Sequence, residues 1–204
     1  MYQTKKNIKE YERAIQFVRE NRKNFIILSC QYNNNFKLFP ALVSFAAFLR
    51  GRKSIFHTAL IVNSGNKVYS LEITPKRLAL ANFKENYFTP NFEGILNAQV
   101  VKGDKTKEDE QKIYKYINNN VLNNRYGKIK AMRSWWKLWE QKDDDKTIYC
   151  TDKVLDIIEK FGGHKIFSNN AEVTPASLYH KLLDDYRFTN KYCTKIQQLN
   201  NCSL

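Results

Sequence analysis

The stretch SIFHTALIVNSGNKVYSLEI, residues 54–73, decides the fold. Its first half, Ser54–Val62, is rich in β-branched and aromatic residues, and Lys67–Ile73 repeats that composition. A polar, glycine-containing turn separates the two runs. Such a pattern predicts a β-hairpin. Because side chains alternate along a strand, Glu72 shares a face with Val68 and Ser70, and its carboxylate can reach His57 on the first arm.

Periodic patterns outside the hairpin predict the rest of an α+β domain with an antiparallel sheet packed against helices. We expect strands over 25–30 and 95–101. We expect helices over 5–22, 38–49 and 106–122, a strand end or loop that runs into a helix within 147–163, and another helix beginning at Pro175 after the capping residue Thr174. NNRYGK, residues 123–128, is expected to be a turn. The predicted organisation is an N-terminal helical extension (1–24), the main domain (25–187) and a polar, loosely ordered C-terminal tail (188–204).

The apolar segment Leu38–Leu49 has two interpretations. It is about twelve residues long, whereas a membrane-spanning helix needs ~20. It also lacks the polar face of a helix that lies on a membrane. We therefore favour a helix buried in the core.

Composition and charge limit the class of protein. The chain has 204 residues, of which 43% are hydrophobic and 14% aromatic, so it can build a core and is not wholly disordered. There are 34 basic and 20 acidic side chains, giving a net charge of +14. We favour a compositional habit of AT-rich coding as its cause, and keep an anionic surface or nucleic acid as alternative partners. The oligomeric state is not predicted.

The N-terminal sequence MYQTKKNIKEYER is polar and does not resemble a secretory signal peptide. We expect no transmembrane segment and a cytoplasmic location, or the host cytoplasm or virion if the protein is viral. The four cysteines, Cys30, Cys150, Cys193 and Cys202, would allow two disulfides, but without a leader we expect reduced thiols. Their spacing contains no CxxC pair, so we expect no metal and no cofactor.

Two residues stand out as chemically useful. Cys150 lies just before the helix predicted within 147–163, where free backbone N–H groups favour a thiolate. His57 lies within an apolar strand and needs a hydrogen-bond partner there. A buried structural cysteine and a satisfied core histidine are the alternatives. His164 and His180 have no carboxylate on a paired strand nearby.

Glu72 strengthens the hypothesis that Cys150 and His57 act together in catalysis. A thiol that attacks a carbonyl needs a base to accept its proton, and that base needs a third group to fix its orientation. Cys150, His57 and Glu72 are of the right types for these three roles.

Four blocks of sequence then resemble a known family. In order they are FHTALIV (56–62), KVYSLE (67–72), YCTDKVLDII (149–158) and VTPASLY (173–179). Together they are similar to permuted NlpC-type papain-like cysteine hydrolases, and most of all to the YiiX/YebB-like branch, which has poxvirus members. The resemblance implies a circularly permuted papain-like fold, with Cys150 as nucleophile, His57 as general base and Glu72 as the third residue. It also matches Tyr149, and Tyr126 with the following glycine.

Oxyanion and substrate contacts are less specific. We expect the Cys150 backbone N–H to stabilise an oxyanion, and Gln31, placed just past the first strand, is a second candidate. Tyr149 and Tyr126 are candidates for the same region. The segment 128–142 carries Trp135, Trp136 and Trp139 on one helical face, which we interpret as core. A wall for an acyl chain or sugar, an interfacial helix and base stacking are the alternatives.

Several positions depart from the family pattern and leave the substrate open. Thr151 and Asp152 replace Ser-Glu, and Ala59 replaces a glycine. The resemblance implies hydrolysis of an amide bond, in a peptide, an isopeptide or a peptidoglycan stem, through a thioacyl intermediate. A lipid ester hydrolase or acyltransferase of the same fold is one alternative. A non-catalytic viral, virion or binding protein that retains the fold is the other.

Overall fold

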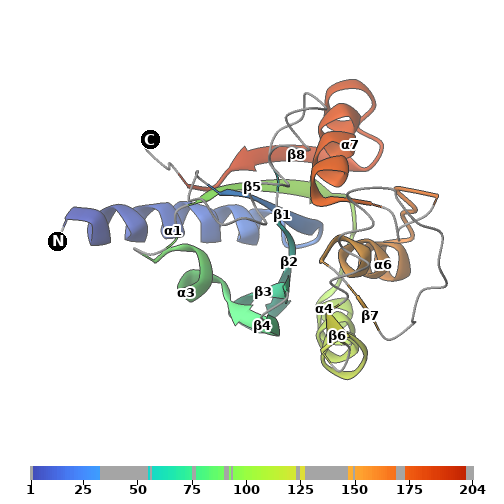
Figure 1. Ribbon diagram of the computed structural model, residues 1–204, viewed down its shortest axis with the longest axis horizontal. Helices are drawn as coiled ribbons and strands as arrows, with labels where there is room; N and C mark the ends of the chain where they lie inside the picture. The colour runs from blue at the N-terminus through green and yellow to red at the C-terminus, as the bar shows by residue number, and fades with distance from the viewer. Residues whose placement is uncertain are drawn as a thin grey trace.

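An antiparallel sheet of six strands forms the centre of the part of the protein that the computed structural model describes (Figure 1). The described residues are 2–32, 55, 57–74, 77–89, 92, 94–122, 125–126, 147–148, 150–168 and 173–200. The strands lie in the order β4 (Arg77–Asn82), β3 (Lys67–Thr74), β2 (His57–Ser64), β1 (Phe25–Tyr32), β5 (Gly94–Val101) and β8 (Cys193–Gln198). Arg125–Tyr126 (β6) and Thr147–Ile148 (β7) form a separate parallel pair.

The predicted hairpin is confirmed. β2 and β3 pair in antiparallel fashion from Ser64↔Lys67 to Leu60↔Leu71. Gly65 has a φ of 61° and opens the two-residue turn. Glycine at this first position suits a type II′ turn, whose twist matches that of the flanking strands.

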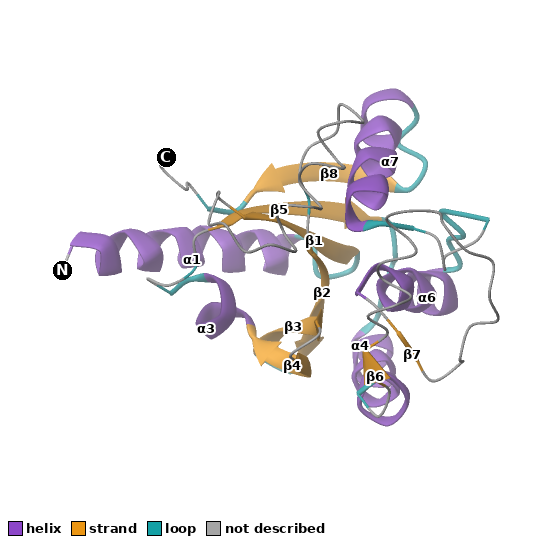
Figure 2. Ribbon diagram, viewed as in Figure 1, coloured by secondary structure: helices purple, strands orange, loops and turns teal. Residues whose placement is uncertain are grey.

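Helices cover both faces of the sheet (Figure 2). One face packs against α1 (Tyr2–Glu20) and α3 (Phe83–Tyr87). The opposite face packs against α4 (Lys107–Tyr116), the π-helical turn η1 (Ile117–Val121), α6 (Cys150–Gly162) and α7 (Pro175–Phe188). Strand alternation creates the two cores, because successive residues of β1 point to opposite faces.

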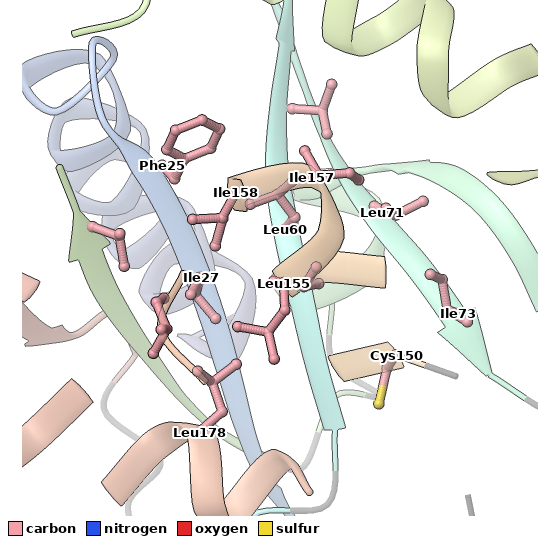
Figure 3. Packing of buried hydrophobic residues seen from close by; sticks show 14 of the residues in the cluster. Phe25, Ile27, Leu60, Leu71, Ile73, Cys150, Leu155, Ile157, Ile158 and Leu178 are labelled. Atoms are coloured by element: carbon pink, nitrogen blue, oxygen red, sulfur yellow. The ribbon is translucent and has the colours of Figure 1, made fainter. Parts of the chain in front are cut away.

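The helix that begins at Cys150 packs on the sheet through one apolar stripe. Val154, Leu155, Ile157 and Ile158 are spaced as one helical face requires, and all four are buried. Figure 3 shows Leu155, Ile157 and Ile158 of this stripe against Phe25, Ile27 and Leu60 of the sheet. The helix thereby fixes its own first residue, Cys150, against the strands.

Local signals at helix ends are confirmed as well. Thr106 and Asp109 form a capping box at the beginning of α4, where the helix was expected to begin. The Thr174 side chain caps α7, with Pro175 in the first turn. Gly163 has a φ of 68° just beyond the end of α6, as helix termination by glycine requires.

Several expectations differ from the structure. Strand β4 and helix α3 were not predicted. Within NNRYGK, the residues of β6 form a strand rather than part of a turn. The predicted helix over 38–49 and the tryptophan segment 128–142 lie outside the described residues.

The expectation of a loosely ordered tail is wrong for the described residues after 187. β8 pairs with β5, and Cys193 within it is fully buried. The buried carboxylate of Asp185 holds this segment, because it accepts hydrogen bonds from the backbone N–H groups of Tyr192 (2.7 Å) and Cys193 (2.6 Å) and from the Thr189 hydroxyl (2.6 Å). Burial raises the pKa of Asp185, but these donors outweigh it and the pKa is lowered.

Replacing Asp185 with Ala should lower the free energy of unfolding by about 2–4 kcal/mol, because three donors lose a charged acceptor. Urea unfolding followed by circular dichroism measures this change. Asp184→Ala, at the exposed neighbouring position, is the control and should change stability by less than about 0.5 kcal/mol. Equal losses in both variants would contradict the anchoring role.

Candidate active site

The three predicted side chains come together where β2 and α6 begin. His57 is the first residue of β2, Cys150 is the first residue of α6, and Glu72 lies near the end of β3. All three are buried: His57 is 8% exposed, Cys150 6% and Glu72 5%. Figure 3 shows Cys150 at the beginning of α6, within the cluster that this helix forms with the sheet.

Glu72 holds His57 through a short contact. His57 Nε2 lies 2.8 Å from Glu72 Oε2. The other carboxylate oxygen, Oε1, accepts hydrogen bonds from the Tyr87 hydroxyl (2.7 Å) and the Asn86 amide (2.9 Å). Burial raises the pKa of Glu72, but the His57 interaction and the Tyr87 hydroxyl help to outweigh it and the pKa is lowered. The buried carboxylate is therefore an anion with both oxygens engaged.

Cys150 and His57 interact, and each shifts the pKa of the other. Burial raises the pKa of the Cys150 thiol, but the hydrogen bond and charge of His57 outweigh it and the pKa is lowered. Burial lowers the pKa of His57, whereas Cys150 and Glu72 raise it to about 10. Between the two pKa values the pair is a thiolate and an imidazolium, which is the reactive form of a cysteine nucleophile.

The strand pairing explains how Cys150 reaches His57. The β1–β2 ladder extends to Cys30↔His57, but the β2–β3 ladder ends at Leu60↔Leu71. The first residues of β2 are thus unpaired on the side that faces β3. The backbone N–H of Thr58 donates to the Cys150 sulfur there instead. The Thr151 hydroxyl, 3.8 Å away, is a further partner of this sulfur.

Of the other predicted site residues, the structure describes Gln31 and the backbone of Tyr126. Gln31 lies within β1, not past its end as expected, with Ile95 as its strand partner. It is adjacent to Cys30, the strand partner of His57. The backbone of Tyr126 pairs with that of Ile148 in the β6–β7 ladder, close in sequence to Cys150. Tyr149 and the Tyr126 side chain lie outside the described residues, and the oxyanion roles stay predictions.

The other two described thiols differ from Cys150. Burial raises the pKa of Cys30, which is fully buried, as is typical of an inert thiol. Burial also raises the pKa of Cys193 to about 11, above that of an ordinary thiol. Cys202 is outside the described residues. Among the described residues, no group of three or more His, Cys, Asp and Glu side chains is arranged to hold a metal ion.

Sequence reasoning missed Asn86 and Tyr87, which bind Glu72. They lie on α3, a short helix whose first turn is capped by the Asn82 side chain. Asn82 immediately before a Phe–Tyr pair spaced four residues apart was the available signal for this helix.

Comparisons with known proteins include a weak likeness among the solved structures. No protein-family model matches the chain, and no curated protein sequence matches it. Among solved structures, the chain is similar to the metalloprotein YiiX of Escherichia coli O157:H7, described as DUF1105. The two are 16% identical, with a TM-score of 0.48, over 82% of this chain and 83% of the other. Within the described part of this chain, no helix has the length and apolarity needed to cross a bilayer.

Brief alkylation of the folded protein should label Cys150 before the other described cysteines. The lowered pKa of Cys150 favours its thiolate, whereas Cys30 and Cys193 are buried and have raised pKa values. Peptide mapping by mass spectrometry after a time course measures the order. Faster labelling of Cys193 would show that the wrong thiol has been identified.

The pH dependence of Cys150 alkylation should show how strongly His57 activates the Cys150 thiol. In the wild type the midpoint should lie well below ~8.5, the value of a free thiol, with fast reaction already near pH 6–7. His57→Ala removes the raised-pKa imidazolium that favours the thiolate, so the midpoint should move upward toward 8.5. Glu72→Gln should move it in the same direction by less. A wild-type midpoint near 8.5 would mean that the thiol is not activated.

Proposed function

We propose that the protein is a cysteine hydrolase with a circularly permuted papain-like arrangement that cleaves an amide bond. One observation supports this most strongly: a buried thiol of lowered pKa lies against an imidazole that a buried carboxylate holds. A cysteine kept only for packing needs neither partner, and burial alone would raise its pKa, as it does for Cys30.

In the proposed first half-reaction the Cys150 thiolate attacks the carbonyl carbon of the amide. The electron pair of the C=O bond moves to oxygen, and the Cys150 backbone N–H at the beginning of α6 donates to this oxyanion. The His57 imidazolium then protonates the departing nitrogen, and the C–N bond breaks. Because Nε2 of His57 faces Glu72, Nδ1 is the nitrogen left to carry this proton.

In the second half-reaction water hydrolyses the thioester. Neutral His57 takes a proton from the water, and the hydroxide attacks the acyl carbon. The C–S bond then breaks and releases a carboxylic acid, and the thiolate–imidazolium pair is restored. Glu72 remains ionised throughout and orients the ring, which is the role of the third member of such a triad. The scheme uses no metal and no cofactor.

The substrate is proposed from chemistry alone. An amide in a peptide, an isopeptide or a peptidoglycan stem is our first choice, and an ester or acyl transfer from a lipid is the alternative within the same scheme. The net charge of +14 favours an anionic substrate or surface through long-range attraction.

A substrate screen with matched variants tests the proposal. Peptide, isopeptide, peptidoglycan and phospholipid substrates are incubated with wild type, Cys150→Ala and the control Cys193→Ala, and products are identified by mass spectrometry. Wild type and the control should hydrolyse one class, and Cys150→Ala should lose activity by at least about 10³-fold. A thioacyl adduct should be trapped on Cys150 by rapid acid quench.

The outcomes separate the functional classes. Cleavage of only the phospholipid would replace the amide by an ester. Equal activity of Cys150→Ala and wild type would overturn the cysteine mechanism. No turnover of any substrate, together with a wild-type alkylation midpoint near 8.5, would favour a non-catalytic binding protein.

A further inference from the structure

The Glu72 carboxylate is held from the side opposite His57 by helix α3. The Tyr87 hydroxyl donates to Oε1 at 2.7 Å, and the Asn86 amide donates to the same oxygen at 2.9 Å. Oε2 is taken by His57 at 2.8 Å. A carboxylate with one free oxygen can rotate. Both oxygens of Glu72 are engaged in polar contacts, so its carboxylate is held in a single orientation.

Tyr87 is itself held rigidly. It is 4% exposed, and its ring packs edge-on against Phe83 (5.9 Å between centroids) and Phe92 (5.2 Å). Its hydroxyl also interacts with the Cys30 thiol, and each shifts the pKa of the other. Cys30 is the strand partner of His57, so this interaction links Tyr87 to the strand pair that carries the imidazole.

Tyr87 stays a donor at every pH at which the protein would work. Burial, reinforced by the nearby Glu72 carboxylate, raises the pKa of its hydroxyl well above 10. The hydroxyl proton is therefore available to the carboxylate. Asn86 has no ionisation of its own, so both donors to Oε1 are independent of pH.

We propose that Tyr87 is a positioning residue of this site: with Asn86, its hydroxyl fixes the Glu72 carboxylate in the orientation that meets His57 Nε2. The inference rests on the proposed function for its importance in turnover. Its physical content, the coupling of Tyr87 to Glu72, belongs to the folded protein without substrate. Helix α3 would then be part of the active site even though its residues need not touch the reacting atoms.

The matched variants are Tyr87→Phe, which removes only the hydroxyl, and Tyr11→Phe. Tyr11 lies on α1 in the same aromatic cluster, with its ring against Phe83 and Phe88. It therefore tests the loss of a tyrosine hydroxyl from this cluster without a contact to Glu72. Asn86→Ala removes the second donor and provides an independent variant should Tyr87→Phe fold poorly.

The measurement is the titration of the Glu72 side-chain carboxyl by ¹³C NMR in the full-length, glutamate-labelled protein. The ionisable groups that act on Glu72 or experience its charge, among the described residues, are His57 on β2, Tyr87 on α3 and Cys30 on β1. In the wild type the midpoint should lie below ~4.3, the ordinary value for Glu. Tyr87→Phe should move it upward by about one pH unit, because the ionised form loses a donor.

Asn86→Ala should move the Glu72 midpoint in the same direction, and Tyr11→Phe should leave it unchanged. Equal midpoints in wild type, Tyr87→Phe and Asn86→Ala would overturn the inference. So would equal shifts in Tyr87→Phe and Tyr11→Phe, because they would reflect a general loosening of the cluster.

Turnover separates this inference from the proposed function. If a substrate is hydrolysed, Tyr87→Phe should lower kcat about tenfold with KM changed less than twofold, because Tyr87 orients the triad and does not bind substrate. A fall confined to KM would overturn the positioning role. If the Glu72 midpoint shifts as expected but no substrate is hydrolysed, the proposed function fails while the coupling of Tyr87 to Glu72 stands.

Discussion

The rest of the candidate site depends on one buried carboxylate, that of Glu72, a residue that is only 5% exposed. Removing such an anion from water costs several kcal/mol unless it is paired and fully hydrogen-bonded. Glu72 meets that requirement with an imidazole from β2 and two donors from α3. Neither partner alone would suffice, because each satisfies only one carboxylate oxygen. The hairpin and the short helix after β4 must therefore both be in place before the site is stable.

The candidate site also requires that the Cys150 thiol lie next to the His57 imidazole. In a fully paired sheet, the backbone N–H groups of central strands are consumed by their neighbours. Here the β2–β3 ladder stops at Leu60↔Leu71, and Thr58 contributes its N–H to Cys150 instead. The apolar stripe of α6 holds the helix against the strands and sets where its first residue falls. Packing far from Cys150 in the helix thus determines the geometry at its first turn.

Sequence patterns predicted the parts of this arrangement that depend on nearby residues. The hairpin, the Thr106 and Thr174 caps and the apolar face of α6 are all encoded within a few positions. The approach of His57 to Glu72 followed because one hairpin carries both.

Other parts depend on distant partners and escaped prediction. β8 has the polar sequence CTKIQQ, and it is a strand because β5 offers an edge and Asp185 binds its first amides. Helix α3 is only five residues long, too short for periodicity to identify, and it is stabilised by burying Phe83 and Tyr87. The pairing of Asn86 and Tyr87 with Glu72 is a tertiary contact that no local pattern contains.

The order of the three side chains along the chain sets when the thiol becomes reactive during synthesis. His57 and Glu72 are only fifteen residues apart, so their hairpin can form while the ribosome is still making the rest. Cys150 emerges much later, after β5 and α4, and its pKa stays that of a free thiol until α6 docks. The nascent chain therefore carries no activated nucleophile, and chemical reactivity appears only when nearly the whole domain has folded.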